Sequence, residues 1–346
     1  MLFNPEFIIT AKTNKFLIEI ERVRGFLDAI KIKEEWFSAI QKEALILEAH
    51  YSTHIEGTAL TFEQAKEILT GNDIKGVKID DKKELLNYKK AMDFISTYLG
   101  KDDPITEGLI REIHKILVRA VRGGQAEPGK YRRVQNYVVS SKTGEIIYTP
   151  PLPLEVSHLM REFTQWLNKN KDISNILTAG IAQFQFVHIH PFLDGNGRTA
   201  RLLSTLILYK TGYDFKKLFT LSEYYDKDRP AYYKAIQSVR ENNMDMTFWL
   251  EYFVEGLYSQ MKHIRQESER VIKYDLVLQK VEAMGLKKRQ IDALKFIIQN
   301  QSISRLQYVE KFKVSLRTAN YDLSLLESKG LIEKIGIGRA IKYLLK

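Results

Sequence analysis

The feature that most constrains the fold is a glycine-rich turn that leads directly into a helix. Gly195 and Gly197 flank Asn196, and glycine tolerates positive φ and a close approach of the backbone to a ligand. The segment that follows, Arg198–Lys210, has apolar residues at helical spacing. The first N–H groups of a helix are unpaired and lie at the positive end of its dipole. The sequence therefore predicts a phosphate-binding helix N-terminus at this turn.

Charged side chains around the turn supply what a nucleotide triphosphate requires. Arg198 and Arg201 are three residues apart, so both can lie on one helix face and grip two phosphates. Asp194 precedes the turn, where a carboxylate beside phosphates is a candidate magnesium ligand. His190 lies four residues earlier, and histidine is well suited to proton transfer near neutral pH. The G-x-x-x-x-G-K-[ST] phosphate loop and the dinucleotide fingerprint are both absent from the sequence.

A second polar motif stands at the end of a predicted helix, Glu43–Ile55. Gly57 is well placed to terminate this helix, and Ser52 and Glu56 are four residues apart and share a face. A glutamate in the last turn opposes the helix dipole, so it requires a cationic partner or another reason to be there. Local physics alone also allows an exposed glutamate before a helix stop.

Two β-rich runs around a glycine-containing turn predict a hairpin. The runs are Gly129–Val139 and Ile146–Pro151, with Lys142–Gly144 as the turn, and the hairpin is expected to span residues 134–151. A simple surface hairpin is the alternative to a functional one. The candidate binding residues of the hairpin are Val138, Val139, Ile146, Ile147 and Tyr148.

The run His190–Arg201 resembles the signature of the Fic family, H-x-F-x-[DE]-G-N-G-R-x-x-R, at every defined position. The resemblance implies transfer of AMP from ATP to a Ser, Thr or Tyr hydroxyl of a target protein, with Mg²⁺ as cofactor. A minority of Fic proteins transfer UMP, phosphate or phosphocholine instead. The implied roles are a base for His190, a magnesium ligand for Asp194, an anion hole for Gly195, Asn196 and Gly197, and binding of the distal phosphates for Arg198 and Arg201.

The resemblance also gives the second motif a role. Many Fic proteins carry an inhibitory helix with the pattern [ST]-x-x-x-E-[GN], which Ser52, Glu56 and Gly57 fit. The glutamate is then expected to pair with Arg201 and to block the seat of the γ-phosphate. In some relatives the same glutamate supports removal of AMP.

The remaining resemblances concern the target and the nucleotide base. The predicted hairpin resembles the Fic flap, which holds a target segment by strand addition, and main-chain pairing is indifferent to side chains. Tyrosines after the catalytic helix resemble a segment that lines the adenine pocket in relatives, although they are equally compatible with core packing. The candidates for the adenine pocket are Tyr224, Tyr225 and Tyr232.

Composition narrows the class of protein. The chain has 346 residues, enough for two or three domains, and its 19 glycines, 8 prolines and helical apolar spacing favour a mainly helical fold. The absence of cysteine excludes disulfides, thiolate metal sites and a cysteine nucleophile. No signal-like segment opens the sequence and no apolar run approaches about eighteen residues. A cytoplasmic protein without a membrane partner is therefore expected.

The basic charge of the chain is concentrated in its tail. Gly285–Lys346 holds 13 Lys and Arg against 5 Asp and Glu, whereas the net charge of the whole chain is +10. Three predicted helices followed by a hairpin resemble a winged helix-turn-helix, whose third helix enters the DNA major groove. The alternative is that this domain makes protein contacts or forms a homodimer. The candidates for DNA contact are Lys313, Arg317, Asn320 and Tyr321, with Arg339 and Lys342 on the wing.

Together these features predict a mainly α protein, a Fic helical bundle with a small β-hairpin flap, plus a C-terminal winged helix-turn-helix domain. We expect an N-terminal helical region (1–105) with an inhibitory helix around 43–57, a catalytic core (106–262), a connecting helix (263–284) and the winged-helix domain (285–346). The expected activity is protein adenylylation, held in check by Glu56. A nucleotide-sensing regulator that binds DNA through its tail, or removal of AMP, are the alternatives.

Overall fold

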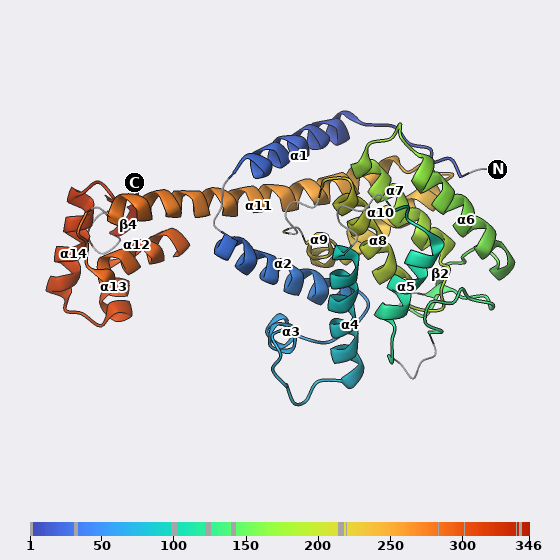
Figure 1. The fold of residues 1–346 in the computed structure, drawn as a ribbon, viewed down its shortest axis with the longest axis horizontal. Coiled ribbons are helices and arrows are strands. Elements are labelled where there is room, and N and C mark those ends of the chain that lie inside the picture. The colour runs from blue at the N-terminus through green and yellow to red at the C-terminus, as the bar shows by residue number, and fades with distance from the viewer. Residues whose placement is uncertain are drawn as a thin grey trace. The chain divides into compact units, whose positions relative to one another are not determined.

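The chain divides into two units, Met1–Ile264 and Arg265–Lys346, in the computed structural model (Figure 1). The structure describes residues 3–30, 34–97, 103–121, 126–139, 143–213, 218, 220–282, 284–300, 302–336, 338 and 341–346. Both units are mainly helical, as the sequence predicts. Within the described part of the chain, no helix combines the length and the apolar character that crossing a bilayer requires.

Helices make up almost all of the first unit. α2 ends at Ile55, as predicted, but it begins at Glu34 rather than at Glu43. Thr10, Thr61 and Thr106 each cap a helix by accepting a backbone N–H with the side chain. The helices are α1 (Ala11–Ala29), α2 (Glu34–Ile55), α3 (Phe62–Leu69), α4 (Ile79–Ser96), α5 (Glu107–Leu117), α6 (Pro153–Lys169), α7 (Asn175–Ile189), α8 (Asn196–Lys210), α9 (Leu221–Lys227), α10 (Arg229–Glu241) and the first part of α11 (Thr247–Glu282).

Helices α7 and α8 pack against each other at the centre of this unit, among α4, α5 and α6 (Figure 1). α7 is apolar on nearly all sides, which is the pattern of a helix buried all round. At Gly180 of α7 a Cβ atom would lie 2.9 Å from side-chain atoms of both Leu250 and Phe253. The missing side chain therefore lets α11 approach closely, and the indole N–H of Trp249 donates to the Gly180 carbonyl at 2.8 Å.

The connection from α7 to α8 uses two left-handed residues. His190 follows the last residue of α7 with φ 51°, and Gly195 precedes α8 with φ 77°. The predicted turn at Gly195–Gly197 is thus shorter than expected, because Asn196 and Gly197 already belong to the first turn of α8. A left-handed conformation at a non-glycine residue such as His190 is strained and is characteristic of functional sites.

The predicted hairpin is present but small. β1 (Val138–Val139) pairs antiparallel with β2 (Ile146–Tyr148), with Val138 opposite Tyr148 and an irregular register after Val138. The expectation of a strand over Gly129–Tyr137 is wrong. Arg132 explains this difference, because its buried guanidinium pulls the segment inward and donates from Nε to the His190 carbonyl at 2.9 Å.

The second unit has three helices followed by an antiparallel hairpin. Ser304 and Ser315 cap α13 and α14 by accepting a backbone N–H with the side chain. The buried carboxylate of Asp322 on α14 accepts hydrogen bonds from Arg289, Gln290 and Tyr308, so it ties the three helices together. The elements are α12 (Lys288–Asn300), α13 (Arg305–Phe312), α14 (Leu316–Ser328), β3 (Ile332–Ile335) and β4 (Lys342–Leu345).

Candidate active site

His190 is held as a neutral imidazole. Its Nδ1 lies 3.2 Å from the Val187 carbonyl, which can only accept, so Nδ1 carries the proton and Nε2 is left as the acceptor. Burial lowers the pKa of His190 to about 4, although the Val187 carbonyl opposes this shift. At neutral pH the side chain is therefore a base whose Nε2 can take a proton.

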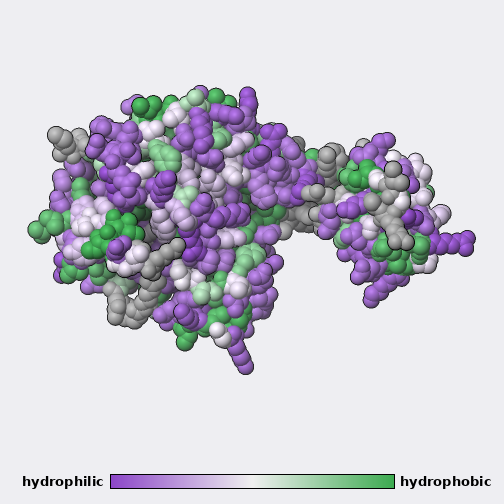
Figure 2. All heavy atoms as spheres, turned by 180° about the vertical axis from the view of Figure 1, so that it is seen from behind, coloured by the Kyte–Doolittle hydropathy of each residue, from purple (hydrophilic) through white to green (hydrophobic). Residues whose placement is uncertain are grey.

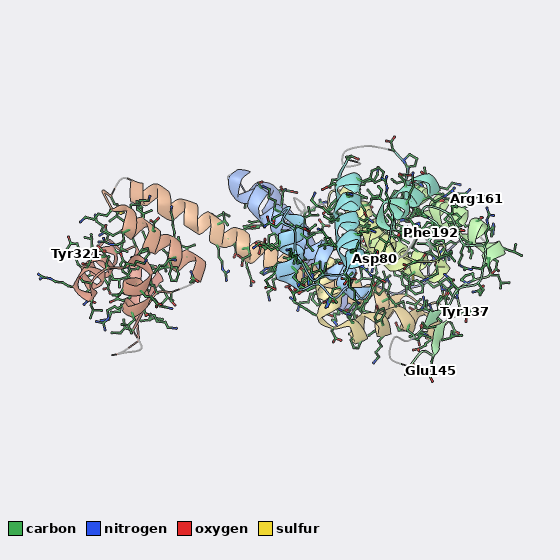
Figure 3. All side chains as sticks on the ribbon, turned by 90° about the horizontal axis from the view of Figure 1, so that it is seen from below. Asp80, Tyr137, Glu145, Arg161, Phe192 and Tyr321 are labelled. Atoms are coloured by element: carbon green, nitrogen blue, oxygen red, sulfur yellow. The ribbon has the colours of Figure 1, made fainter. Side chains whose placement is uncertain are left out.

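Phe192 anchors the loop between His190 and α8. The ring is fully buried (Figure 3) and stacks on the His114 ring at 3.6 Å with an interplanar angle of 2°. The Asn196 side chain accepts from the Phe192 N–H at 2.9 Å and donates to its carbonyl at 2.8 Å, and Asn136 donates to the same carbonyl. Because the Asn196 amide is used in this way, its backbone N–H is what remains for a ligand.

His114 on α5 fixes the backbone at Asp194, a role that no pattern in the sequence indicates. Its Nδ1 accepts from the Gly129 N–H at 3.0 Å, so its Nε2 carries the proton and donates to the Asp194 carbonyl at 2.9 Å. Burial lowers the pKa of His114 to about 4. The neutral ring thus links α5, the segment before the hairpin and the loop that precedes α8.

Arg201 meets the last two turns of α2. Its Nε donates to the Ser52 hydroxyl at 2.8 Å, and its Nη2 donates to the Ser52 carbonyl and to Glu56 Oε1, both at 2.8 Å. Arg201 is buried; burial lowers its pKa, but the Glu56 carboxylate outweighs this and raises the pKa above its usual value. Gly57, with φ 101°, ends the helix directly after Glu56. The structure thus joins two motifs that lie about 145 residues apart.

Gly197 makes room for the Glu56 carboxylate. A Cβ atom at Gly197 would overlap Glu56 Oε1 and would lie 3.3 Å from Arg201 Nη1. The carboxylate therefore lies against the first turn of α8, where the unpaired N–H groups and the helix dipole attract an anion. The predicted anion site is filled by a side chain of the same protein.

Arg198 has a partner that the sequence did not predict. Its guanidinium is almost completely buried and donates from Nη1 to Oε2 of Glu84 on α4 at 2.7 Å, while Nη2 lies 3.6 Å from Asp194 Oδ1. Arg198 and Arg201 were expected to bind phosphates side by side, yet each is engaged by a different carboxylate. A buried cation requires such a partner, and the pairing spans 114 residues, so no local pattern reveals it.

Asp194 is the acidic side chain that the motif offers to a metal. Its Oδ1 accepts from the Gly195 N–H at 2.6 Å. The described residues contain no group of three His, Cys, Asp or Glu side chains arranged to hold a metal ion. Magnesium usually takes one or two carboxylates plus substrate oxygens, so this site fits the ion when nucleotide phosphates complete its coordination.

Two of the three predicted adenine-pocket tyrosines lie in the core. Tyr225 is fully buried and Tyr232 nearly so, with their rings stacked at 4.3 Å. Tyr224 is partly buried and packs on Gly256, where a Cβ atom would lie 2.6 Å from its ring. The rings of Tyr225 and Tyr232 thus contribute to core packing, the Tyr232 hydroxyl also interacts with Arg201, and the role of these tyrosines in an adenine pocket stays a prediction.

The hairpin exposes apolar side chains. Val139, Ile146 and Ile147 are each at least half exposed, and Val138 and Tyr148 are partly buried. Figure 2 shows apolar side chains reaching the surface of the first unit among polar ones, and Figure 3 places Tyr137 and Glu145 of the hairpin at its periphery.

In the second unit, most of the predicted DNA-facing residues that the structure describes are at the surface. Lys313, Arg317 and Lys342 are exposed, Tyr321 is 64% exposed (Figure 3) and Asn320 is half-buried. Arg339 lies outside the described residues.

Comparison with known proteins gives this geometry a family. Residues 104–208 match the profile of the Fic/DOC family. The protein adenylyltransferase Fic of Drosophila grimshawi is 30% identical over 254 residues, which are 70% of this chain and 51% of that protein. The protein of the same name from Aedes aegypti is 35% identical over 198 residues, 56% of this chain and 38% of that protein. The chain thus spans about half or less of the length of these relatives.

Solved structures show the same fold. A Fic family protein from Desulfovibrio desulfuricans superposes with a TM-score of 0.67 at 21% identity and covers 99% of this chain, which covers 98% of it. Fic-1 from C. elegans superposes with a TM-score of 0.61 at 24% identity, over 76% of this chain and 73% of that one. The signature at 190–201, the matched profile and the shared fold agree, and this chain carries a Fic domain within residues 104–208.

Proposed function

We propose that the protein is an adenylyltransferase that transfers AMP from ATP to a Ser, Thr or Tyr hydroxyl of a target protein. The observation that carries this proposal is a neutral histidine with Nε2 as acceptor, one short loop away from a helix N-terminus that already holds an anion. Relatives named protein adenylyltransferase Fic match 70% and 56% of the chain.

The chemistry follows from these groups. His190 Nε2 takes the proton of the target hydroxyl, and the hydroxyl oxygen forms a bond to the α-phosphorus of ATP. The bond from the α-phosphorus to the bridging oxygen breaks, and pyrophosphate leaves with the electron pair. The N-terminus of α8 stabilises the charge that develops on the phosphate oxygens. Asp194 would hold Mg²⁺, which would supply neutralisation of the phosphate charge.

The second part of the proposal is that the protein is autoinhibited by Glu56. The carboxylate occupies the position beside Arg201 that a distal phosphate needs, and two anions so close together repel each other. Only after Glu56 leaves does Arg201 offer its guanidinium to ATP. The pairing of Glu56 with Arg201 and its overlap with the space above Gly197 support this idea.

A labelling experiment tests both parts. Wild type, Glu56→Gly and His190→Ala in the Glu56→Gly background are incubated with ATP labelled in the α-phosphate and with Mg²⁺. We expect strong protein labelling with Glu56→Gly, weak labelling with wild type and none when His190 is also replaced. Mass spectrometry of the labelled protein then identifies the transferred group. Equal labelling of wild type and Glu56→Gly would reject the autoinhibition, and no label in any variant would reject the transferase.

The exposed cationic face of the tail favours a second function, binding of duplex DNA. Lys313, Arg317 and Tyr321 are exposed at or near the N-terminal half of α14, which is the part of a recognition helix that reaches base edges. Phosphate contacts make such binding fall steeply with salt. Fluorescence polarisation with a labelled duplex between 50 and 200 mM salt tests this, with Arg317→Gln compared with Lys295→Gln on α12. Salt-insensitive or absent binding would reject it.

A further inference from the structure

Tyr148 is the residue of strand β2 that turns inward. Ile146 and Ile147 are exposed, whereas Tyr148 is partly buried. Its hydroxyl lies 2.9 Å from Nδ1 of His188 and 2.9 Å from the His188 carbonyl oxygen. The hairpin is therefore attached by one side chain to the last turn of α7, two residues before His190.

Arg240 on α10 supports this attachment from the other side. Its guanidinium carbon lies 3.5 Å from the centre of the Tyr148 ring and 5.7 Å from that of Phe184. Its Nε and Nη2 are buried without a hydrogen-bond acceptor among the described residues, while Nη1 donates to Gln237. The Tyr148 ring is thus a main partner of this cation. Moving the ring away would leave a buried charge with little compensation.

The four side chains form one stack between the hairpin and the catalytic loop. His188 packs on Phe184 of the same helix at 5.8 Å, and its ring lies 5.6 Å from that of Tyr148. His188 is neutral, because burial and the nearby Arg240 lower its pKa to about 4. The His188 carbonyl can only accept, so the Tyr148 hydroxyl donates to it, and Nδ1–H of the neutral ring donates to the hydroxyl oxygen.

From this geometry we propose that Tyr148 is a positioning residue that fixes the hairpin relative to His190, through His188 and with Arg240 stacked on its ring. The inference rests on the proposed transferase for its meaning. A target strand paired to the hairpin edge takes its register from the hairpin, so Tyr148 sets how its hydroxyl meets His190 Nε2. Transfer depends steeply on this distance, since a misplacement of about 1 Å can cost about 100-fold in rate.

The substitution Tyr148→Phe separates positioning from packing. It keeps the ring on Arg240 and removes both hydrogen bonds to His188. Tyr137→Phe, a hydroxyl deletion at an exposed tyrosine of the same hairpin, is the matched control. Hydrogen exchange of the amides in residues 143–148 and long-range nitrogen NMR of the His190 imidazole are measured on both variants of the full chain.

We expect Tyr148→Phe to speed exchange in the hairpin about five- to tenfold, as loss of net hydrogen bonding predicts. We also expect it to shift the His190 imidazole signals, and Tyr137→Phe to do neither. In the Glu56→Gly background, Tyr148→Phe should lower kcat for protein labelling and leave KM for ATP near its starting value.

Exchange and His190 signals that match those of Tyr137→Phe would overturn the proposal. So would an effect of Tyr148→Phe confined to KM for ATP. Hydrogen exchange and NMR of His190 do not require catalysis. They therefore decide whether Tyr148 positions the hairpin relative to His190 even if the labelling experiment rejects the transferase.

Discussion

Glu56 Oε1 lies 2.8 Å from Arg201 Nη2 and occupies the space that a side chain at position 197 would fill. Arg201 therefore binds this carboxylate, and Gly197 leaves the space that the carboxylate occupies. The contact depends on both residues, so each can be used to probe it.

Gly197→Ala tests this contact. The new Cβ would overlap the Glu56 carboxylate, so we expect it to destabilise the protein by about 1–3 kcal/mol, as overpacking does. In a Glu56→Gly background the overlap is absent, and alanine has the better helix propensity, so the same change should then cost little. Urea unfolding of wild type, the two single variants and the double variant gives the coupling free energy between the two positions. Equal effects of Gly197→Ala in the two backgrounds would contradict this arrangement.

Glu84→Gln tests the buried ion pair with Arg198. The substitution removes the nearer of the two carboxylates beside a buried guanidinium and leaves only the longer contact with Asp194, so we expect a loss of about 3–5 kcal/mol in the free energy of unfolding. Asp93→Asn on the same helix is the control, because its pair with Lys89 is solvent-exposed and should contribute little. Chemical denaturation measures both, and a Glu84→Gln effect no larger than that of Asp93→Asn would disprove the role of the pair.

The low pKa of His190 predicts an unusual pH profile. Burial lowers this pKa to about 4, so the imidazole stays an acceptor well below pH 6.5. We expect kcat/KM for labelling by Glu56→Gly to show no decline attributable to this histidine between pH 7 and 5, and an acid limb only near pH 4. Initial rates across this range measure it. An acid limb with a midpoint near 6.5 would assign an ordinary pKa to the base.

His114 predicts how stability depends on pH. Its pKa is about 4 in the folded protein and about 6.5 in the unfolded chain, so the unfolded state binds more protons between these values. The contribution of His114 is complete above pH 6.5 and is lost as pH falls towards 4. From pH 7 to pH 5 the loss is about 2 kcal/mol. NMR titration of the His114 ring checks the cause, and urea unfolding of wild type and of a His114 replacement at both pH values isolates the effect from those of His188 and His190.

A replacement of the exposed His158 on α6 is the control for this experiment. It should leave the change in unfolding free energy between pH 7 and pH 5 as it is in wild type. A ring proton of His114 that titrates near 6.5 in the folded protein would refute the prediction.

The sequence predicted the features that depend on neighbouring residues. Gly57 as a helix stop and a helix that follows the Gly195–Gly197 turn are examples, and both follow from local hydrogen bonding and backbone freedom. The pairing of Glu56 with Arg201 was also expected, but only because the two motifs resemble those of a known family.

The residues that sequence reasoning missed act over long separations. Glu84, His114 and Arg132 have ordinary surroundings in the sequence, and only folding places them against Arg198, Asp194 and His190. The buried tyrosines show that an aromatic pattern alone is ambiguous. An aromatic run has the same appearance whether it lines a ligand pocket or fills a core, and Tyr225 does the latter.

Asp322 in the second unit has a consequence for how that unit can change. The side chains that hold α14 in place, led by this carboxylate, are separate from those that α14 exposes, such as Arg317 and Tyr321. The exposed residues of α14 can therefore be substituted at little cost in folding stability, because the contacts that hold α14 against α12 and α13 are unchanged. Divergence between related tails should accordingly concentrate on those exposed residues.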